Sequence, residues 1–113
     1  GENGHIAFND PPDALFSDPH WVKVVKLAEV SRRQQVGEGH FSSLSEVPTH
    51  AITLTIPALL APKTILCIVP ETRKAEAVRS CLNEPVSEKT PGSILRTMKH
   101  ARLYLDSESS ASL

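Results

Sequence analysis

The chain has 113 residues, of which 40% are hydrophobic, and its formal net charge is −1. This length corresponds to one domain or part of one, and the composition is that of a folded globular protein rather than a disordered chain. The absence of a basic excess and the low aromatic content of 4% argue against nucleic-acid binding. No apolar run approaches the roughly 20 residues that a membrane span needs.

The first half of the chain predicts two strands separated by a polar segment. Residues 21–27 are rich in β-branched side chains and predict a strand. Residues 28–41 are rich in Arg, Gln, Glu and Gly and predict either a loosely packed helix or a mobile loop. Residues 51–55 predict a second strand, which continues into a short apolar helix at 56–60.

The second half alternates apolar runs and helical patterns. Residues 64–69 are almost continuously apolar, which is typical of a strand buried on both faces of a parallel sheet. Residues 73–82 predict a helix with one apolar face. A short helix at 91–98 and a last strand at 102–105 complete the pattern, and we expect the serine-rich end to fray.

This alternation of strands and helices predicts an α/β fold with a doubly wound, mostly parallel, Rossmann-like sheet. About four strands and three or four helices make roughly half of such a domain. We therefore expect an unpaired sheet edge and an incomplete helical layer, with a missing half that is required for stable folding.

The opening residues contain the best candidates for catalysis. Gly1 and Gly4 permit close approach of the backbone to a ligand, and His5 is suited to proton transfer near neutral pH. Asp10 can hold the other ring nitrogen of this histidine. The alternative is a polar loop in which Asp10 caps a turn before Pro11, and spacing alone does not decide between them.

Lys74 is the candidate anion-binding residue. It lies in the first turn of a predicted helix that follows a buried strand, and ligands bind at this edge of open α/β sheets. The free N–H groups of the helix N-terminus, together with a cation, suit a phosphate group. The alternative is a solvated charged face formed by Arg73, Lys74, Glu76 and Arg79.

No pattern in the sequence predicts a metal or a cofactor. The five histidines lack paired spacing, Cys67 and Cys81 are fourteen positions apart, and no nucleophile motif is present. The segment Gly37-Glu38-Gly39 is more typical of a flexible loop than of a phosphate loop. Both cysteines are predicted to be reduced core residues, as is usual in the cytoplasm.

Residues 1–11 read Gly-Glu-Asn-Gly-His-Ile-Ala-Phe-Asn-Asp-Pro. This stretch resembles the catalytic-loop signature of glucosamine-6-phosphate deaminases, G-x-[DN]-G-H-[IL]-[AG]-F-N-[ED]-P. The pair Phe8-Asn9 separates it from the related 6-phosphogluconolactonases. Residues 46–53, 73–77 and 91–96 are similar to further segments of these deaminases, so the resemblance spans nearly the whole chain.

The resemblance implies a doubly wound domain of about twice this length, with residues 1–113 as its C-terminal part and residues 28–46 as its lid. It implies a cytoplasmic hydrolase or isomerase that converts glucosamine 6-phosphate to fructose 6-phosphate and ammonia without a cofactor or metal. The isolated chain is expected to be inactive, because the proton-transferring aspartate and a phosphate loop belong to the missing half. The oligomeric state stays open, a homo-oligomer included.

The same resemblance implies a role for each candidate residue. His5 is the acid/base of sugar ring opening, and Asp10 is the carboxylate that orients it. Asn3, Gly4 and Lys74 bind the substrate, with Lys74 on the 6-phosphate. Because Asn3 stands where many members have aspartate, it can only hydrogen-bond the substrate or His5.

The lid departs from the family pattern at Gly39. Well-studied members have a phosphate-binding arginine here, and the alignment does not place Arg32 or Arg33 in its position. The loss of this arginine removes a charge-assisted hydrogen bond, which is worth about 1.5–3 kcal/mol. Two alternatives follow: a related isomerase or lactonase acting on another phosphosugar, or a non-catalytic protein that binds a sugar phosphate.

Overall fold

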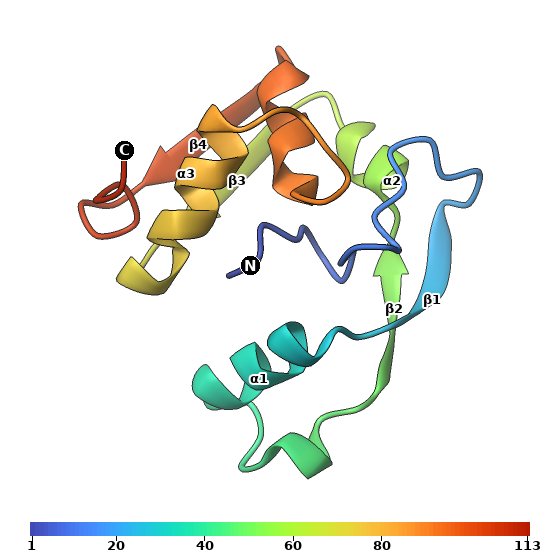
Figure 1. Cartoon of the computed structure of the whole chain (residues 1–113). Helices are drawn as coiled ribbons and strands as arrows, with labels where there is room; N and C mark the ends of the chain where they lie inside the picture. Colours follow the sequence, from blue (N-terminus) through green and yellow to red (C-terminus); the bar gives the residue numbers. More distant parts are fainter.

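A computed structural model describes residues 1–113 and contains four strands and three α-helices (Figure 1). The strands are β1 (Val22–Lys26), β2 (His50–Leu54), β3 (Ile65–Val69) and β4 (Ala101–Leu105). The α-helices are α1 (Glu29–Gly37), α2 (Ile56–Leu60) and α3 (Ala75–Asn83). Three 3-10 helices complete the chain: η1 (Leu44–Glu46), η2 (Thr72–Lys74) and η3 (Pro91–Thr97). The predicted α/β class is confirmed, and each predicted strand is present within one or two residues.

The four strands form two separate pairs. β3 and β4 are parallel, with Ile65 opposite Ala101, as an α/β fold requires. β1 and β2 are antiparallel, with Val22 opposite Leu54, which the expectation of a mostly parallel sheet did not include. Helix α1 buries only Ser31 and Gln34, so it has no apolar face with which to cover a sheet as a crossover helix does. The chain therefore leaves along β1, passes through α1 and η1, and returns along β2.

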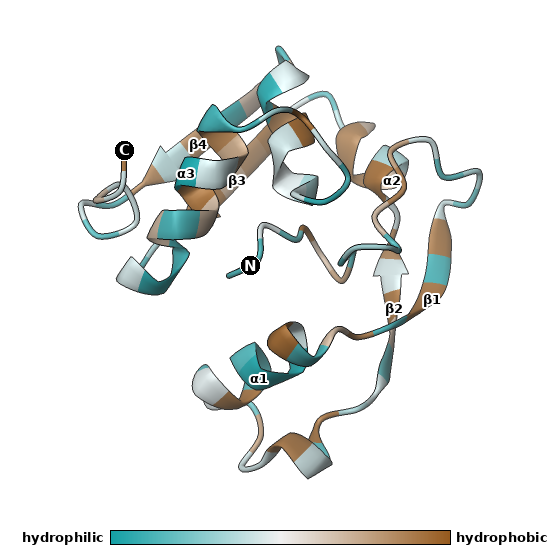
Figure 2. Ribbon diagram, viewed as in Figure 1, coloured by the Kyte–Doolittle hydropathy of each residue, from teal (hydrophilic) through white to brown (hydrophobic).

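The β3–β4 pair is covered on one face by α3 and η3 (Figure 1). Helix α3 buries Ala75, Ala77 and Val78, which confirms its predicted apolar face. The prediction that residues 64–69 are buried on both faces is wrong for this chain, because Leu66 is 60% exposed and Ile68 is 71% exposed. Figure 2 shows the apolar character of β3 and the largely hydrophilic ribbon of α1.

Two further expectations are corrected by the structure. The serine-rich end does not fray: the backbone N–H of Ser109 donates to Asp106 Oδ1 at 2.7 Å, and that of Ser110 donates to the Asp106 carbonyl. Cys67 and Cys81 are free thiols, as predicted, but they are half-buried rather than core residues. None of the helices has the length and apolar character that a bilayer crossing demands.

Candidate active site

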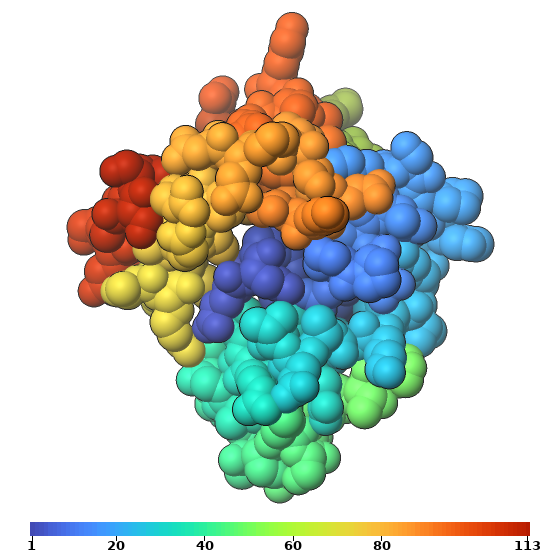
Figure 3. Space-filling model, viewed as in Figure 1, coloured from blue at the N-terminus to red at the C-terminus, as the bar shows by residue number.

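The opening residues lie at the centre of the molecule, between α1 on one side and α3 with η3 on the other (Figures 1 and 3). Gly4 has a φ of +79°, and a Cβ atom there would lie 3.0 Å from Thr90 Cγ2 and 3.4 Å from Cys81 Sγ. Its carbonyl accepts a 2.7 Å hydrogen bond from the backbone N–H of Gly92. Glycine at this position therefore allows the loop to pass close to α3. The loop carries His5 into the space between α1 and α3.

His5 is held by an amide and a carboxylate. The Asn3 side chain donates from Nδ2 to Asp10 Oδ1 at 2.9 Å, so its Oδ1 faces His5 Nδ1 at 2.6 Å. Asp10 Oδ1 lies 3.2 Å from the same ring nitrogen. Because both oxygens are acceptors, Nδ1 carries a proton, and Nε2 has no hydrogen-bond partner in the chain. Asn3 thus makes one of its two predicted contacts, that with His5.

Ser31 is a member of this network that the sequence did not reveal. It lies on α1, is 3% exposed, and donates from Oγ to Asp10 Oδ1 at 2.7 Å. Its Oγ also lies 3.2 Å from His5 Nδ1, from which it accepts. The only signal in the sequence was a small polar residue in a polar segment, and many such residues are exposed.

Asp10 is ionised in this network. It is 2% exposed, and this burial by itself raises the pKa of the carboxyl. Hydrogen bonds from His5, Asn3 and Ser31 outweigh that effect and hold the pKa of Asp10 well below its usual range. A buried, fixed negative charge beside Nδ1 suits His5 to gain and lose a proton at Nε2.

Lys74 lies at the end of η2, directly before α3. It is 9% exposed, and its Nζ donates to Glu38 Oε1 at 3.1 Å. The alternative of a solvated charged face fits Glu76 and Arg79, which pair with each other at the surface, but it does not fit Lys74. The residue therefore presents its cation to the interior of the molecule.

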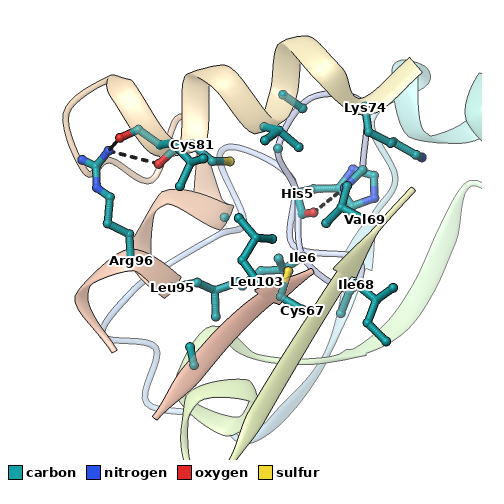
Figure 4. A pocket seen from close by; sticks show the side chains of 18 of the residues that line it. His5, Ile6, Cys67, Ile68, Val69, Lys74, Cys81, Leu95, Arg96 and Leu103 are labelled. Atoms are coloured by element: carbon teal, nitrogen blue, oxygen red, sulfur yellow. Dashed lines mark hydrogen bonds between the residues drawn. The ribbon is translucent and has the colours of Figure 1, made fainter. Parts of the chain in front are cut away.

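His5 and Lys74 line the same pocket, which has a volume of about 470 Å³ (Figure 4). Its walls come from the opening loop and from β3, α3, η3 and β4, and they are largely apolar. Figure 4 shows His5 and Lys74 together on one side of the pocket.

 Cys81, Leu95 and Arg96 lie toward the other side. His5 and Lys74 therefore share one end of a pocket whose remaining lining is mostly apolar, with Arg96 and Arg102 as its other charged residues.

Neither arginine of α1 is free for the role of the lid arginine whose absence the sequence predicted at Gly39. The Arg32 guanidinium donates to the carbonyls of Leu44 and Val47 at 2.8 and 2.9 Å. Arg33 pairs with Glu29 at the surface. Both are therefore engaged away from His5, and Lys74 is the cation that lies beside it. No group of three or more His, Cys, Asp or Glu side chains is placed to hold a metal ion.

The fold and the site together define an α/β protein with a histidine–carboxylate pair and a buried lysine at one pocket. A solved structure described as a monomeric glucosamine-6-phosphate deaminase of the NagB superfamily matches this fold with a TM-score of 0.91. The match has 34% sequence identity and covers 100% of this chain and 45% of that one.

Curated relatives agree with the structural match. The glucosamine-6-phosphate deaminase of Oceanobacillus iheyensis is 40% identical over 94% of this chain, and that of Exiguobacterium sibiricum is 37% identical over 100% of it. The chain spans about two fifths of the length of these relatives, 40% and 43% respectively. No family model matches the chain. The chain is therefore a homologue of the glucosamine-6-phosphate deaminases, and the resemblance of its opening motif is confirmed.

Proposed function

We propose that residues 1–113 are the C-terminal part of an enzyme that converts glucosamine 6-phosphate to fructose 6-phosphate and ammonia. The observation that carries this proposal is the His5 network, in which Asn3 and Asp10 fix the proton on Nδ1 and leave Nε2 free. The names of the relatives support the substrate and the place of the reaction in amino sugar metabolism.

In the proposed reaction, His5 opens the sugar ring. Nε2 takes the proton of the C1 hydroxyl, the bond between C1 and the ring oxygen breaks, and the resulting imidazolium returns the proton to that oxygen. The Asp10 carboxylate stabilises the imidazolium while it exists. Lys74 binds the 6-phosphate as a cation. The base that moves a proton between C1 and C2 comes from outside residues 1–113.

Residues 28–46 form the proposed lid, which contains α1 and η1. This segment supplies Ser31 to the site, so its position bears directly on the His5 network. A cytoplasmic location belongs to the same proposal, because Cys67 and Cys81 are free thiols. The solved relative is described as monomeric, and we extend a monomeric state to this protein as a proposal.

One observation favours a second candidate function. Gly39 replaces the lid arginine, and Arg32 and Arg33 are engaged elsewhere, so the phosphate has fewer cations than in the family pattern. A related enzyme that acts on another phosphosugar would fit this reduced charge.

The decisive experiment measures ammonia release from glucosamine 6-phosphate by the full-length protein that contains this chain. We expect turnover by the wild type and its loss in the His5→Gln variant, which keeps a polar side chain but cannot exchange a proton. Isomerisation of another phosphosugar without ammonia release would favour the second candidate. Absence of any turnover, with the His5→Gln variant behaving like the wild type, would refute an enzymatic function.

A further inference from the structure

Glu38 forms an ion pair with Lys74, the cation of the proposed phosphate site. Its Oε1 accepts hydrogen bonds from Lys74 Nζ at 3.1 Å and from Gln34 Nε2 at 2.8 Å. Glu38 follows the last residue of α1, whereas Lys74 precedes α3, so this contact joins segments 36 positions apart. The Lys74 side chain is only 11% exposed and that of Glu38 is 25% exposed, so the pair is largely shielded from water.

The Glu38 carboxylate is an anion at the position where the substrate phosphate has to bind. Burial raises the pKa of Glu38, but the hydrogen bonds from Gln34 and Lys74 outweigh this effect and lower it overall. The carboxylate is therefore ionised at neutral pH. One buried ammonium group cannot give its full charge to a carboxylate and a phosphate at once, so the two anions compete.

The surroundings of Glu38 allow its side chain to move away from Lys74. Gly37 and Gly39 flank Glu38, and Gly39 has a φ of +81° with no atom within 4 Å of the position a Cβ would take. The helix before it, α1, buries only polar side chains, Ser31 and Gln34, so little apolar burial holds this segment in place. His40 Nε2 lies 3.6 Å from Glu38 Oε2 and is well exposed, which offers the carboxylate a partner nearer to solvent.

We infer that Glu38 is an internal competitor for the anion site at Lys74, and that it has to be displaced before the phosphate of a phosphosugar binds there. The inference rests on the proposed function, since it takes Lys74 as the phosphate-binding residue. It assigns to Glu38 a role in setting substrate affinity, distinct from the acid/base role of His5. It also gives the segment Gly37-Glu38-Gly39 a purpose that its sequence did not indicate.

The test compares Glu38→Gln with the wild type in the full-length protein. Glutamine keeps an acceptor oxygen for Gln34 and Lys74 but removes the charge that competes with phosphate. We expect the Kd for inorganic phosphate and the KM for glucosamine 6-phosphate to fall about three- to tenfold, with kcat within about twofold of the wild type. Glu38→Asp, which keeps the charge, is expected to stay close to the wild type.

Glu29→Gln is the matched control, because Glu29 lies on α1, the helix that directly precedes Glu38, and its side chain is 63% exposed. This control removes the same charge, and we expect no change in either constant. An equal decrease of the Kd for phosphate in Glu29→Gln and Glu38→Gln would overturn the inference, since the change in net charge alone would explain both. Unchanged or weaker phosphate binding in Glu38→Gln would overturn it as well.

A Lys74→Gln variant separates the inference from the proposed function. If Lys74→Gln weakens phosphate binding and Glu38→Gln does not tighten it, the role of Glu38 fails while the phosphate site stands. If Lys74→Gln leaves phosphate binding unchanged, Lys74 is not the phosphate-binding residue, and both the site and the inference fail.

Discussion

Asp10 shows how much of this site depends on single hydrogen bonds. Its two oxygens receive donors from the Asn3 amide, the Ser31 hydroxyl and the backbone N–H of Ala28, and His5 Nδ1 lies beside them. The opening motif predicted a carboxylate next to a histidine, and the structure places the two in contact. Ser31 and Ala28 could not be predicted, because their approach depends on how α1 packs against the opening loop.

The Asp10→Asn variant tests the charge of this carboxylate through stability. The folded-state pKa of Asp10 lies below its usual value of about 3.9, so the carboxylate stabilises the fold at higher pH. That contribution is lost as the pH falls below about 4 toward the folded-state pKa. We expect Asp10→Asn to lose about 1–3 kcal/mol of unfolding free energy at pH 7, and the difference from wild type to shrink as the solution is acidified.

Urea denaturation of the full-length protein at a series of pH values measures this difference. Asp13→Asn serves as the control, because the Asp13 side chain makes no hydrogen bond, and we expect it to change stability little at any pH. A deficit in Asp10→Asn that stays constant from neutral to acidic pH would contradict the assignment of an ionised, stabilised carboxylate.

The Ser31→Ala variant tests whether α1 contributes to the chemistry. The change removes a donor to Asp10 and an acceptor for His5 Nδ1 while leaving the packing of the helix nearly intact. A lost hydrogen bond to a charged group is worth about 1.5–3 kcal/mol, so we expect kcat/KM for glucosamine 6-phosphate to fall about 10- to 100-fold. Ser45→Ala in η1, away from His5, is expected to retain full activity. Equal losses in the two variants would argue for a general effect on the proposed lid, residues 28–46.

At the scale of elements, the apolar patterns in the sequence predicted helices and strands better than the polar patterns did. The strands at 64–69 and 102–105 were found from their apolar runs, and the apolar face of α3 was found because burial imposes a regular spacing on it. The polar segment 28–41 left a helix and a loop equally open, since α1 packs through Ser31 and Gln34. The antiparallel pairing of β1 with β2 also escaped prediction, because strand direction depends on the path of the connecting segment.

Arg96, which lies in η3, caps the C-terminal end of α3. Its guanidinium donates to the carbonyls of Cys81, Leu82 and Glu84, which an isolated helix would leave without partners. We expect Arg96→Ala to lower the unfolding free energy by about 1–2 kcal/mol. Arg79→Ala, which removes only surface pairs with Glu76 and Glu84, should have a smaller effect. Thermal unfolding of both variants provides the comparison, and equal losses would mean that the Arg96 contacts add nothing specific.

At the scale of the whole molecule, both strand pairs leave large apolar side chains uncovered. Monomeric proteins rarely leave such faces in water, and the curated relatives are more than twice as long as this chain. The exposed residues of the strands are Val22, Val24, Ile52, Leu54, Leu66, Ile68, Leu103 and Tyr104. The remainder of the proposed enzyme is the natural cover for them, which agrees with the incomplete layer expected from the sequence.

This proposal predicts opposite effects for one pair of substitutions in two contexts. In the isolated chain, Leu66→Ser with Ile68→Thr removes exposed apolar surface, so we expect less self-association in analytical ultracentrifugation. In the full-length protein we expect the same side chains to be buried, so their truncation should cost about 2–5 kcal/mol of unfolding free energy. Val86→Thr, an exposed position outside the strands, is the control and should change neither property much. Full-length protein that tolerates the double substitution without loss of stability would show that another part of the chain does not cover this face.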